Sequence, residues 1–318
     1  MDNLCHTLTG AALGQAGLAH RTRHGMVTLL IASNLPDIDA ASFFTDTLAV
    51  SFRRGWTHGV LAQALLPPAL AGLVWAIGRW RMPRGKGPPV EPEARFMQLL
   101  TLSYLGLYSH VFLDYLNSYG IRLLMPFSSD WFYGDALYIV DPLMWLVLGG
   151  GAWLTARASK KGTSNARRPA RVALALAATY TLVMLASNLW ARQVVRDGLT
   201  RAGRPADTRF MVTPVFGNPF ARDVVVDTGS RYEKGQLWFE PRPHFRPLGY
   251  GVDKGFDDPG ARAALTAPRA QAYLGWSRFP FVVVDRSSVP PRVFLNDYRY
   301  SDAGGRAGWA GLRVELGE

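Results

Sequence analysis

The stretch FMQLLTLSYLGLYSHVFLDYLN, residues 96–117, combines an apolar helix with two ionisable side chains, His110 and Asp114. Its length is close to the roughly 20 residues that a helix needs to cross the hydrocarbon core of a bilayer. Ionisable groups in such a span are costly, so they indicate a functional role. Because His110 and Asp114 are four residues apart, a helix places both on one face, within reach of a single ion.

Other apolar runs accompany this stretch. The long ones are residues 59–80, 138–156 and 172–191, and two shorter ones are 4–19 and 26–41, which we expect to be re-entrant or short spans. A cleaved signal peptide is a competing interpretation of the first run, but that run lacks a basic n-region. We predict that residues 1–191 form an all-α polytopic membrane bundle of about five or six hydrophobic helices.

The formal net charge of +11 is concentrated in two short loops, residues 79–95 and 157–171, which flank long apolar runs. Short loops rich in Lys and Arg remain in the cytoplasm, so this charge predicts a multi-pass topology, and nucleic-acid binding becomes the weaker interpretation. With both loops inside, His110, Asp114 and the tail from about residue 192 lie outside the cytoplasm. The other candidate ligands named below converge on the same outer face.

The tail has a different pattern from the apolar part. Turn-forming sequences such as FGNP at 216–219 separate short runs at 223–227, 236–239, 281–284 and 292–295. Such runs are typical of strands. We predict that residues 192–318 form a small, mainly β extracytoplasmic domain. We expect its histidine, His244, to be an ordinary exposed side chain.

Further metal-ligand side chains lie near the ends of the apolar runs. Asp37 and Asp39 follow a proline in NLPDID at 34–39, and His58 ends the segment RGWTH at 54–58. Imidazole and carboxylate are the ligands of catalytic zinc sites. The two aspartates could instead cap a helix, and His58 could be an interfacial histidine without a metal. We predict a divalent metal site, with zinc as the expected ion, whose candidate ligands are His6, Asp37, Asp39, His58, His110 and Asp114.

This pattern resembles the YdjM-like family of LexA-binding, inner-membrane-bound metal-dependent hydrolases, over about the first 190 residues. The family is distantly similar to zinc-dependent phospholipase C, which uses an N-terminal His, an Asp, a His and a His-x-x-x-Asp pair in the same order. The resemblance implies a location in the bacterial inner membrane. It implies one ion held by Asp37 or Asp39 with His58, His110 and Asp114, and a second held by His6 with a bridging Asp114.

The soluble phospholipase C enzymes bind a further metal through histidines and a glutamate that follow the His-x-x-x-Asp pair. No histidine lies between His110 and His244 in this chain. That metal is therefore either missing or rebuilt from Asp135 and Asp141, and three-metal chemistry is not expected.

The expected reaction is hydrolysis of a phosphoester by metal-activated water. Whichever of Asp37 and Asp39 is not a ligand would orient or deprotonate that water, and Arg54 and Asp141 are candidate substrate-binding residues. Since the site should open at the outer membrane surface, we expect a phospholipid or lipid-linked phosphate, with a soluble phosphoester as the other possibility.

A rival interpretation is a non-catalytic membrane scaffold or interaction protein whose metal site is structural. Transport is less favoured, because the polar residues gather on one face of the membrane. Membrane lipids are the expected partners and nucleic acid is not. No protein partner is predicted, since contact with a cytoplasmic repressor would have to use the basic loops.

Overall fold

The computed structural model describes residues 1–318 except 46, 81–94, 241, 303–304, 306–307 and 315–318. Residues 1–40 and 53–186 form one compact unit, and residues 41–52 and 187–318 form a second. The long helix α7 (Arg168–Arg201) contributes to both units. Most of the basic loop 79–95, on which the topology prediction partly rests, lies outside the described residues.

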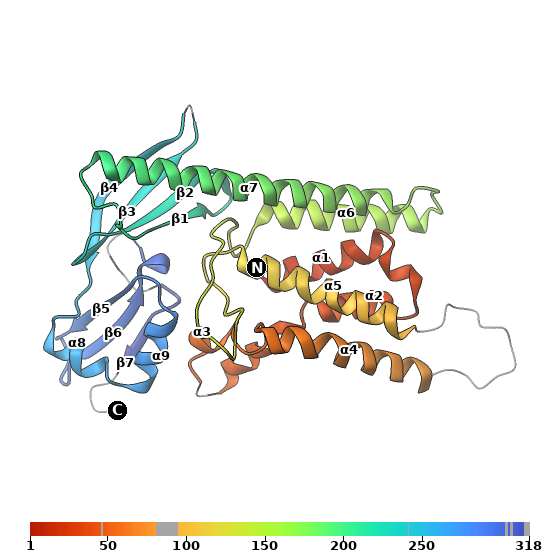
Figure 1. Cartoon of the computed structure of the whole chain (residues 1–318), viewed down its shortest axis with the longest axis horizontal. Helices are drawn as coiled ribbons and strands as arrows, with labels where there is room; N and C mark the ends of the chain where they lie inside the picture. The colour runs from red at the N-terminus through yellow and green to blue at the C-terminus, as the bar shows by residue number, and fades with distance from the viewer. Residues whose placement is uncertain (46, 81–94, 241, 303–304, 306–307, 315–318) are drawn as a thin grey trace, which may run out of the picture. The chain divides into compact units, whose positions relative to one another are not determined.

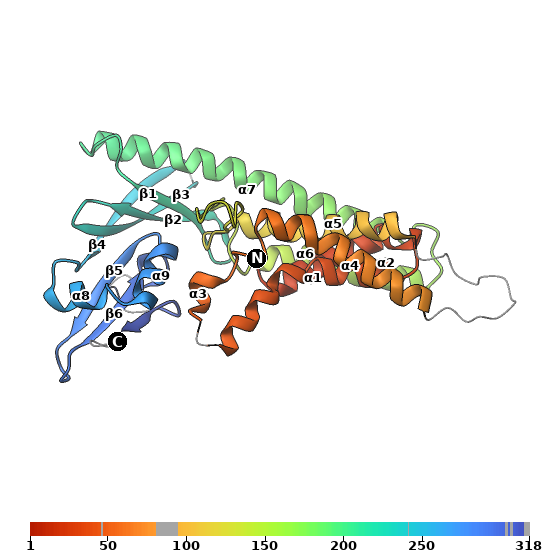
Figure 2. The same cartoon turned by 60° about the horizontal axis from the view of Figure 1, so that its bottom comes forward.

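The first unit is a bundle of helices (Figures 1 and 2). Besides the first part of α7, it contains α1 (Asn3–Gln15), η1 (Leu18–Arg21), α2 (Gly25–Ala32), most of the 3-10 segment η2 (Leu35–Phe44), α4 (Val60–Trp80), α5 (Phe96–Tyr115) and α6 (Pro142–Lys160). Asp2 and Asp141 cap α1 and α6, because their carboxylates accept hydrogen bonds from backbone N–H groups of the first turn.

Three of the described helices, α4, α5 and α7, are long and apolar enough to cross a membrane. This is fewer than the five or six spans predicted from the sequence. The runs at 4–19 and 26–41 form helices of only 13 and 8 residues, which are too short for the roughly 20 residues that a span requires. The run at 138–156 forms α6, whose middle holds three successive glycines and whose last turn is basic.

Small residues bring three helices of the bundle into close contact. A Cβ atom on Gly106 of α5 would lie 2.6 Å from the Cβ of Ala32 in α2, and one on Gly10 of α1 would lie 2.6 Å from Oγ of Ser33. Close helix packing of this kind requires small side chains. As a result, the C-terminal end of α2 lies against α5, next to His110.

The second unit is built mainly from antiparallel strands. One sheet has the order β1 (Phe210–Val215), β2 (Asn218–Asp227), β3 (Arg231–Trp238) and β4 (His244–Asp253), and the other has β5 (Pro280–Asp285), β6 (Arg292–Asp297) and β7 (Leu312–Val314). The short helices α3 (Ala49–Phe52), α8 (Pro259–Ala264) and α9 (Pro268–Trp276) complete it. The four runs predicted as strands fall on β2, β3, β5 and β6, so the expected small β domain is confirmed.

A buried carboxylate at the end of β6, that of Asp297, connects this strand to the segment that follows α9. Asp297 Oδ2 accepts hydrogen bonds from Ser277 Oγ at 2.6 Å and from the N–H of Arg278 at 2.8 Å. It also pairs with Arg299 Nη2 at 2.8 Å, with both side chains fully buried. Burial raises the pKa of the Asp297 carboxyl, but Arg299 and the hydrogen bonds outweigh it and hold the pKa below its usual value.

We expect Asp297→Asn to lower the unfolding free energy of the second unit by about 3–5 kcal/mol at neutral pH, because Arg299 would be left as a buried unpaired charge. In the wild type, the contribution of the lowered pKa is complete above the unfolded value of about 3.9 and is lost as the pH falls through the folded value. Calorimetric unfolding of the purified protein would measure both effects. Asp257→Asn, which removes an exposed ion pair with Arg262, is the control and should change little.

Candidate metal centre

Two buried imidazole rings approach each other within the first unit. His58 lies in the turn before α4, and His110 lies in the second half of α5. Their Nε2 atoms are 3.1 Å apart, and both side chains are fully buried. At this distance the two nitrogen lone pairs repel each other unless one nitrogen carries a hydrogen or both bind the same metal ion.

The opposite ring nitrogens show which atoms hold the hydrogens. His110 Nδ1 lies 2.8 Å from the carbonyl oxygen of Ser33, which can only accept, so Nδ1 donates. His58 Nδ1 lies 2.9 Å from Oγ1 of Thr57, whose own hydroxyl donates to Asp39 Oδ2 at 2.8 Å. Nδ1 of His58 is therefore also the donor. Both Nε2 atoms then present lone pairs to each other, which is how metal-ligating histidines are held by their surroundings.

Burial lowers the pKa of His58, but its hydrogen bonds to Asp114 and Asp39 outweigh burial and raise the pKa above its usual value. Without a metal, a proton on His58 can therefore fill the gap between the two Nε2 atoms. A metal ion must displace that proton, so binding at this position is coupled to pH.

Asp114 lies directly against the two histidines and is fully buried. Its Oδ2 atom is 3.3 Å from His58 Nε2 and 3.5 Å from His110 Nε2. The same oxygen pairs with Arg54 Nε at 2.8 Å, while Oδ1 contacts the amino group of Met1. The predicted helical spacing of His110 and Asp114 thus places both on one face of α5, as expected.

Asp37 completes the group. Ligand atoms of Asp37, His58, His110 and Asp114 all lie within 4.8 Å of one another, and all four residues are buried. This group could hold a metal ion. Asp37 is oriented by Asn3 Nδ2 at 3.0 Å from Oδ2 and by Arg53 Nη2 at 3.1 Å from Oδ1.

Asp39 lies behind His58, outside that group of four. Its Oδ2 atom accepts the backbone N–H of Arg54 at 2.7 Å and the hydroxyl of Thr57, and lies 3.4 Å from His58 Nδ1. Burial raises the pKa of Asp39, but these hydrogen bonds outweigh burial and lower it. The geometry therefore places Asp37 in the group that could hold a metal ion and places Asp39 behind His58, next to its Nδ1 atom.

His6 is next to the group but not within it. Its Nε2 atom is 3.2 Å from Asp114 Oδ1, and its ring stacks on His110 with 3.8 Å between centroids. Its buried Nδ1 atom has no hydrogen-bond partner among the described residues. His6 is thus placed where it could hold a second ion together with Asp114.

The two candidate substrate-binding residues have other contacts. Arg54 is 5% exposed and forms an ion pair with Asp114. Its Nη1 atom donates a hydrogen bond to Asn117 Oδ1 at 2.8 Å. Its backbone has a φ of 57°, which is uncommon for a non-glycine residue and typical of functional sites. Asp141 caps α6 and accepts a hydrogen bond from Tyr180 at 2.9 Å. Neither side chain is placed as an open substrate-binding group.

Several residues around the group escaped the sequence reasoning. They are the carbonyl of Ser33, the hydroxyl of Thr57, and the side chains of Asn3 and Asn117. Asn3, Thr57 and Asn117 had a usable signal, since each is within three residues of a predicted ligand. The Ser33 carbonyl had none, because any residue supplies a backbone oxygen.

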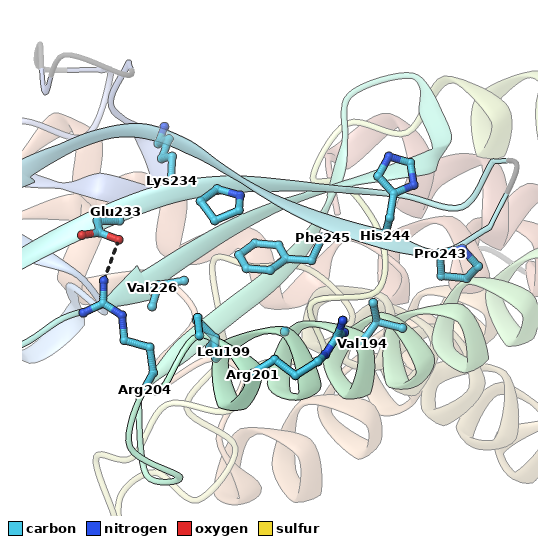
Figure 3. Close-up of a pocket in the computed structure, with 13 residues that line it drawn as sticks. Val194, Leu199, Arg201, Arg204, Val226, Glu233, Lys234, Pro243, His244 and Phe245 are labelled. Atoms are coloured by element: carbon cyan, nitrogen blue, oxygen red, sulfur yellow. Dashed lines mark hydrogen bonds and ion pairs between the residues drawn. The ribbon is translucent and has the colours of Figure 1, made fainter.

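The second unit contains a pocket of about 440 Å³ between α7 and strands β3 and β4 (Figure 3). Val194, Leu199 and Phe245 line it, and Arg204 pairs with Glu233 at 3.4 Å. His244 at its edge is exposed, and its Nδ1 atom bonds to the carbonyl of Arg242 at 2.9 Å. The described residues of this unit contain no group of His, Cys, Asp or Glu side chains that could hold a metal ion.

Comparisons with known proteins agree with the membrane character of the chain. Residues 1–191 match the family model described as YdjM inner membrane protein. The uncharacterized protein YfhP of Bacillus subtilis (strain 168) is 27% identical over 161 residues, which cover 46% of this chain and 43% of that protein. No solved structure matches. These comparisons do not show the similarity to phospholipase C. The YdjM match includes every residue of the candidate metal centre. Because that match covers more than half of the chain, the chain belongs to the YdjM inner membrane protein family.

Proposed function

We propose that this protein is a membrane-bound hydrolase that uses a divalent metal, zinc above all, to cleave a phosphoester of a lipid or lipid-linked substrate. The observation that carries the proposal is the pair of facing Nε2 lone pairs of His58 and His110, with the carboxylates of Asp37 and Asp114 beside them. Two imidazoles and two carboxylates suit zinc. A bound ion would supply Lewis-acid activation of water and of the phosphoryl oxygen.

The side chains around the group have distinct proposed roles. Asp39 and Thr57 hold His58 in the tautomer that offers Nε2, and Arg54 compensates the charge of Asp114. Asp37 is 7% exposed, whereas His58, His110 and Asp114 are fully buried. Arg53, beside Asp37, is 22% exposed at its side chain. We infer that water and the phosphoester approach at this edge, where the Arg53 guanidinium can bind a phosphate oxygen.

The proposal is tested by metal-dependent turnover. Protein stripped by a chelator and reloaded with zinc or manganese should hydrolyse bis(p-nitrophenyl) phosphate or release a labelled headgroup from a phospholipid. The Asp114→Asn variant, once shown to be folded, should be inactive with either substrate. Tight metal binding without turnover on phosphodiesters, phosphomonoesters or phospholipids would contradict the hydrolase.

A structural metal site is the second candidate function. It is supported by the complete burial of His58, His110 and Asp114, because structural metal sites are closed whereas catalytic ones keep an open position. In that case chelation should lower the unfolding temperature strongly, and no metal-dependent hydrolysis should be found.

We also propose a multi-pass arrangement in the bacterial inner membrane, with the metal centre and the second unit outside the cytoplasm. This orientation places the basic segment 157–171, which joins α6 to α7, in the cytoplasm, and it requires α6 to cross the membrane together with α4, α5 and α7. Proteinase K added to intact spheroplasts should then digest the second unit. Protection of this unit until the membrane is lysed would reverse the topology.

A further inference from the structure

An apolar groove of about 300 Å³ lies within the first unit, between α1, α5, α6 and α7. Figure 1 shows α6 and α7 as an antiparallel pair along one side of this bundle. The walls of the groove include Phe112 and Leu113 of α5, Leu148 of α6, and Leu174 and Leu182 of α7. Its volume is at the lower end of the range for small-molecule sites, about 300–1,000 Å³.

The polar side chains that line the groove have no hydrogen to offer a ligand. The Thr9 hydroxyl donates to the carbonyl of Cys5 at 2.8 Å, and that of Ser109 donates to Gly106 at 2.7 Å. The Thr181 hydroxyl donates to the carbonyl of Ala177 at 2.9 Å. All three bonds are made within the residue's own helix. The groove therefore matches a hydrocarbon occupant and not a polar one.

The groove and the metal centre lie at the same level of α5, on neighbouring faces of that helix. Ser109 and Leu113 line the groove, and each immediately precedes a residue of the metal centre, His110 and Asp114. Thr9 lies three residues after His6, which is within one helical turn. Because α5 and α7 are candidate membrane spans, a groove on these helices would face lipid hydrocarbon.

We propose that this groove holds one fatty-acyl chain of a phospholipid substrate, so that its phosphate lies at the metal centre. The proposal rests on the proposed hydrolase and specifies its substrate as a lipid with an extended chain. A chain that leaves bulk lipid gains no hydrophobic free energy, since both surroundings are apolar. Selection of the chain depends on van der Waals fit along the walls, so changes in groove shape should alter occupancy several-fold.

The test uses the full chain in phosphatidylcholine vesicles that contain phosphatidylglycerol with a photoactivatable diazirine on one acyl chain. After illumination, mass spectrometry maps the labelled peptides. We expect labels to concentrate on groove residues of α5, α6 and α7. Ala178→Phe, which fills the groove from α7, should reduce this labelling several-fold.

Ala175→Phe is the matched control, because it makes the same change at an exposed position of α7 that does not line the groove. Ala178→Leu provides a smaller change if the Phe variant does not fold. Labelling spread evenly over the lipid-facing helices, or unchanged by both Ala178 variants, would show ordinary boundary lipid and overturn the proposal.

Failure of the groove and failure of the hydrolase give different results. Groove labelling without any hydrolysis would support the lipid site and contradict the enzyme. Hydrolysis of water-soluble bis(p-nitrophenyl) phosphate without groove labelling would support the enzyme and contradict the lipid site. If both hold, Ala178→Phe should slow hydrolysis of the phospholipid and leave that of the soluble diester unchanged.

Discussion

Purified His110→Ala protein is expected to contain only background metal, whereas the wild type should contain zinc or manganese in near-stoichiometric amount. His110 supplies one of the two facing Nε2 atoms, and the bond from its Nδ1 to the Ser33 carbonyl leaves the Nε2 lone pair free to bind a metal ion. Elemental mass spectrometry of the detergent-purified protein measures the content. His244→Ala is the control, since His244 is an exposed histidine of the second unit, and it should retain the metal.

One further variant and a pH series on the wild type extend this prediction. Asp39→Ala removes the carboxylate behind His58 and should weaken metal affinity about 10–100-fold without abolishing binding. In the wild type, metal retention should be complete above the raised pKa of His58 and fall as the pH decreases through it, because the proton and the ion compete for Nε2. Metal retained in folded His110→Ala protein would contradict the assignment of the site.

Arg54→Met is expected to destabilise the metal-free protein by about 3–5 kcal/mol, since it removes the buried partner of a fully buried carboxylate. Arg54 Nε is 2.8 Å from Asp114 Oδ2, and its side chain is 6% exposed. A bound cation would compensate Asp114 in its place, so the loss should be smaller in the metal-loaded protein. Thermal unfolding with and without a chelator measures both values.

Arg53→Met is the matched control for this prediction. Arg53 is the preceding residue, but its side chain is 22% exposed and contacts Asp37 and Asp39 at 3.1 and 3.5 Å. Its replacement should cost much less stability, and should reduce phosphoester hydrolysis if Arg53 binds the phosphate. Equal unfolding temperatures for the two variants would show that Arg54 is not the essential counter-ion of Asp114.

Much of the architecture could be predicted from local sequence. Residues 96–117 are a long apolar run with a four-residue His–Asp spacing, and helix geometry alone places both side chains on one face of α5. The strands of the second unit could also be predicted, because short apolar runs and the turn residues between them are local patterns of the sequence. The number of spans was overestimated, since apolar runs of 13 and 8 helical residues are too short to cross hydrocarbon.

The distribution of roles within the candidate metal centre could not be read in this way. Asp37 and Asp39 are two residues apart and chemically equivalent in the sequence, and only the fold places one beside the histidine Nε2 atoms and the other behind His58. Arg54 was a candidate for phosphate binding, yet the structure pairs it with Asp114.

The sequence by itself singled out the His and Asp side chains that gather at the candidate metal centre, because a His or Asp beside a membrane span is rare enough to be informative. Only the tertiary structure decided how these side chains are arranged around one another. The Ser33 carbonyl reaches His110 only because Gly106 lets α2 approach α5, and that contact fixes which imidazole nitrogen is free. Such long-range packing leaves no pattern in the local sequence, since it depends on the summed shape of several helices.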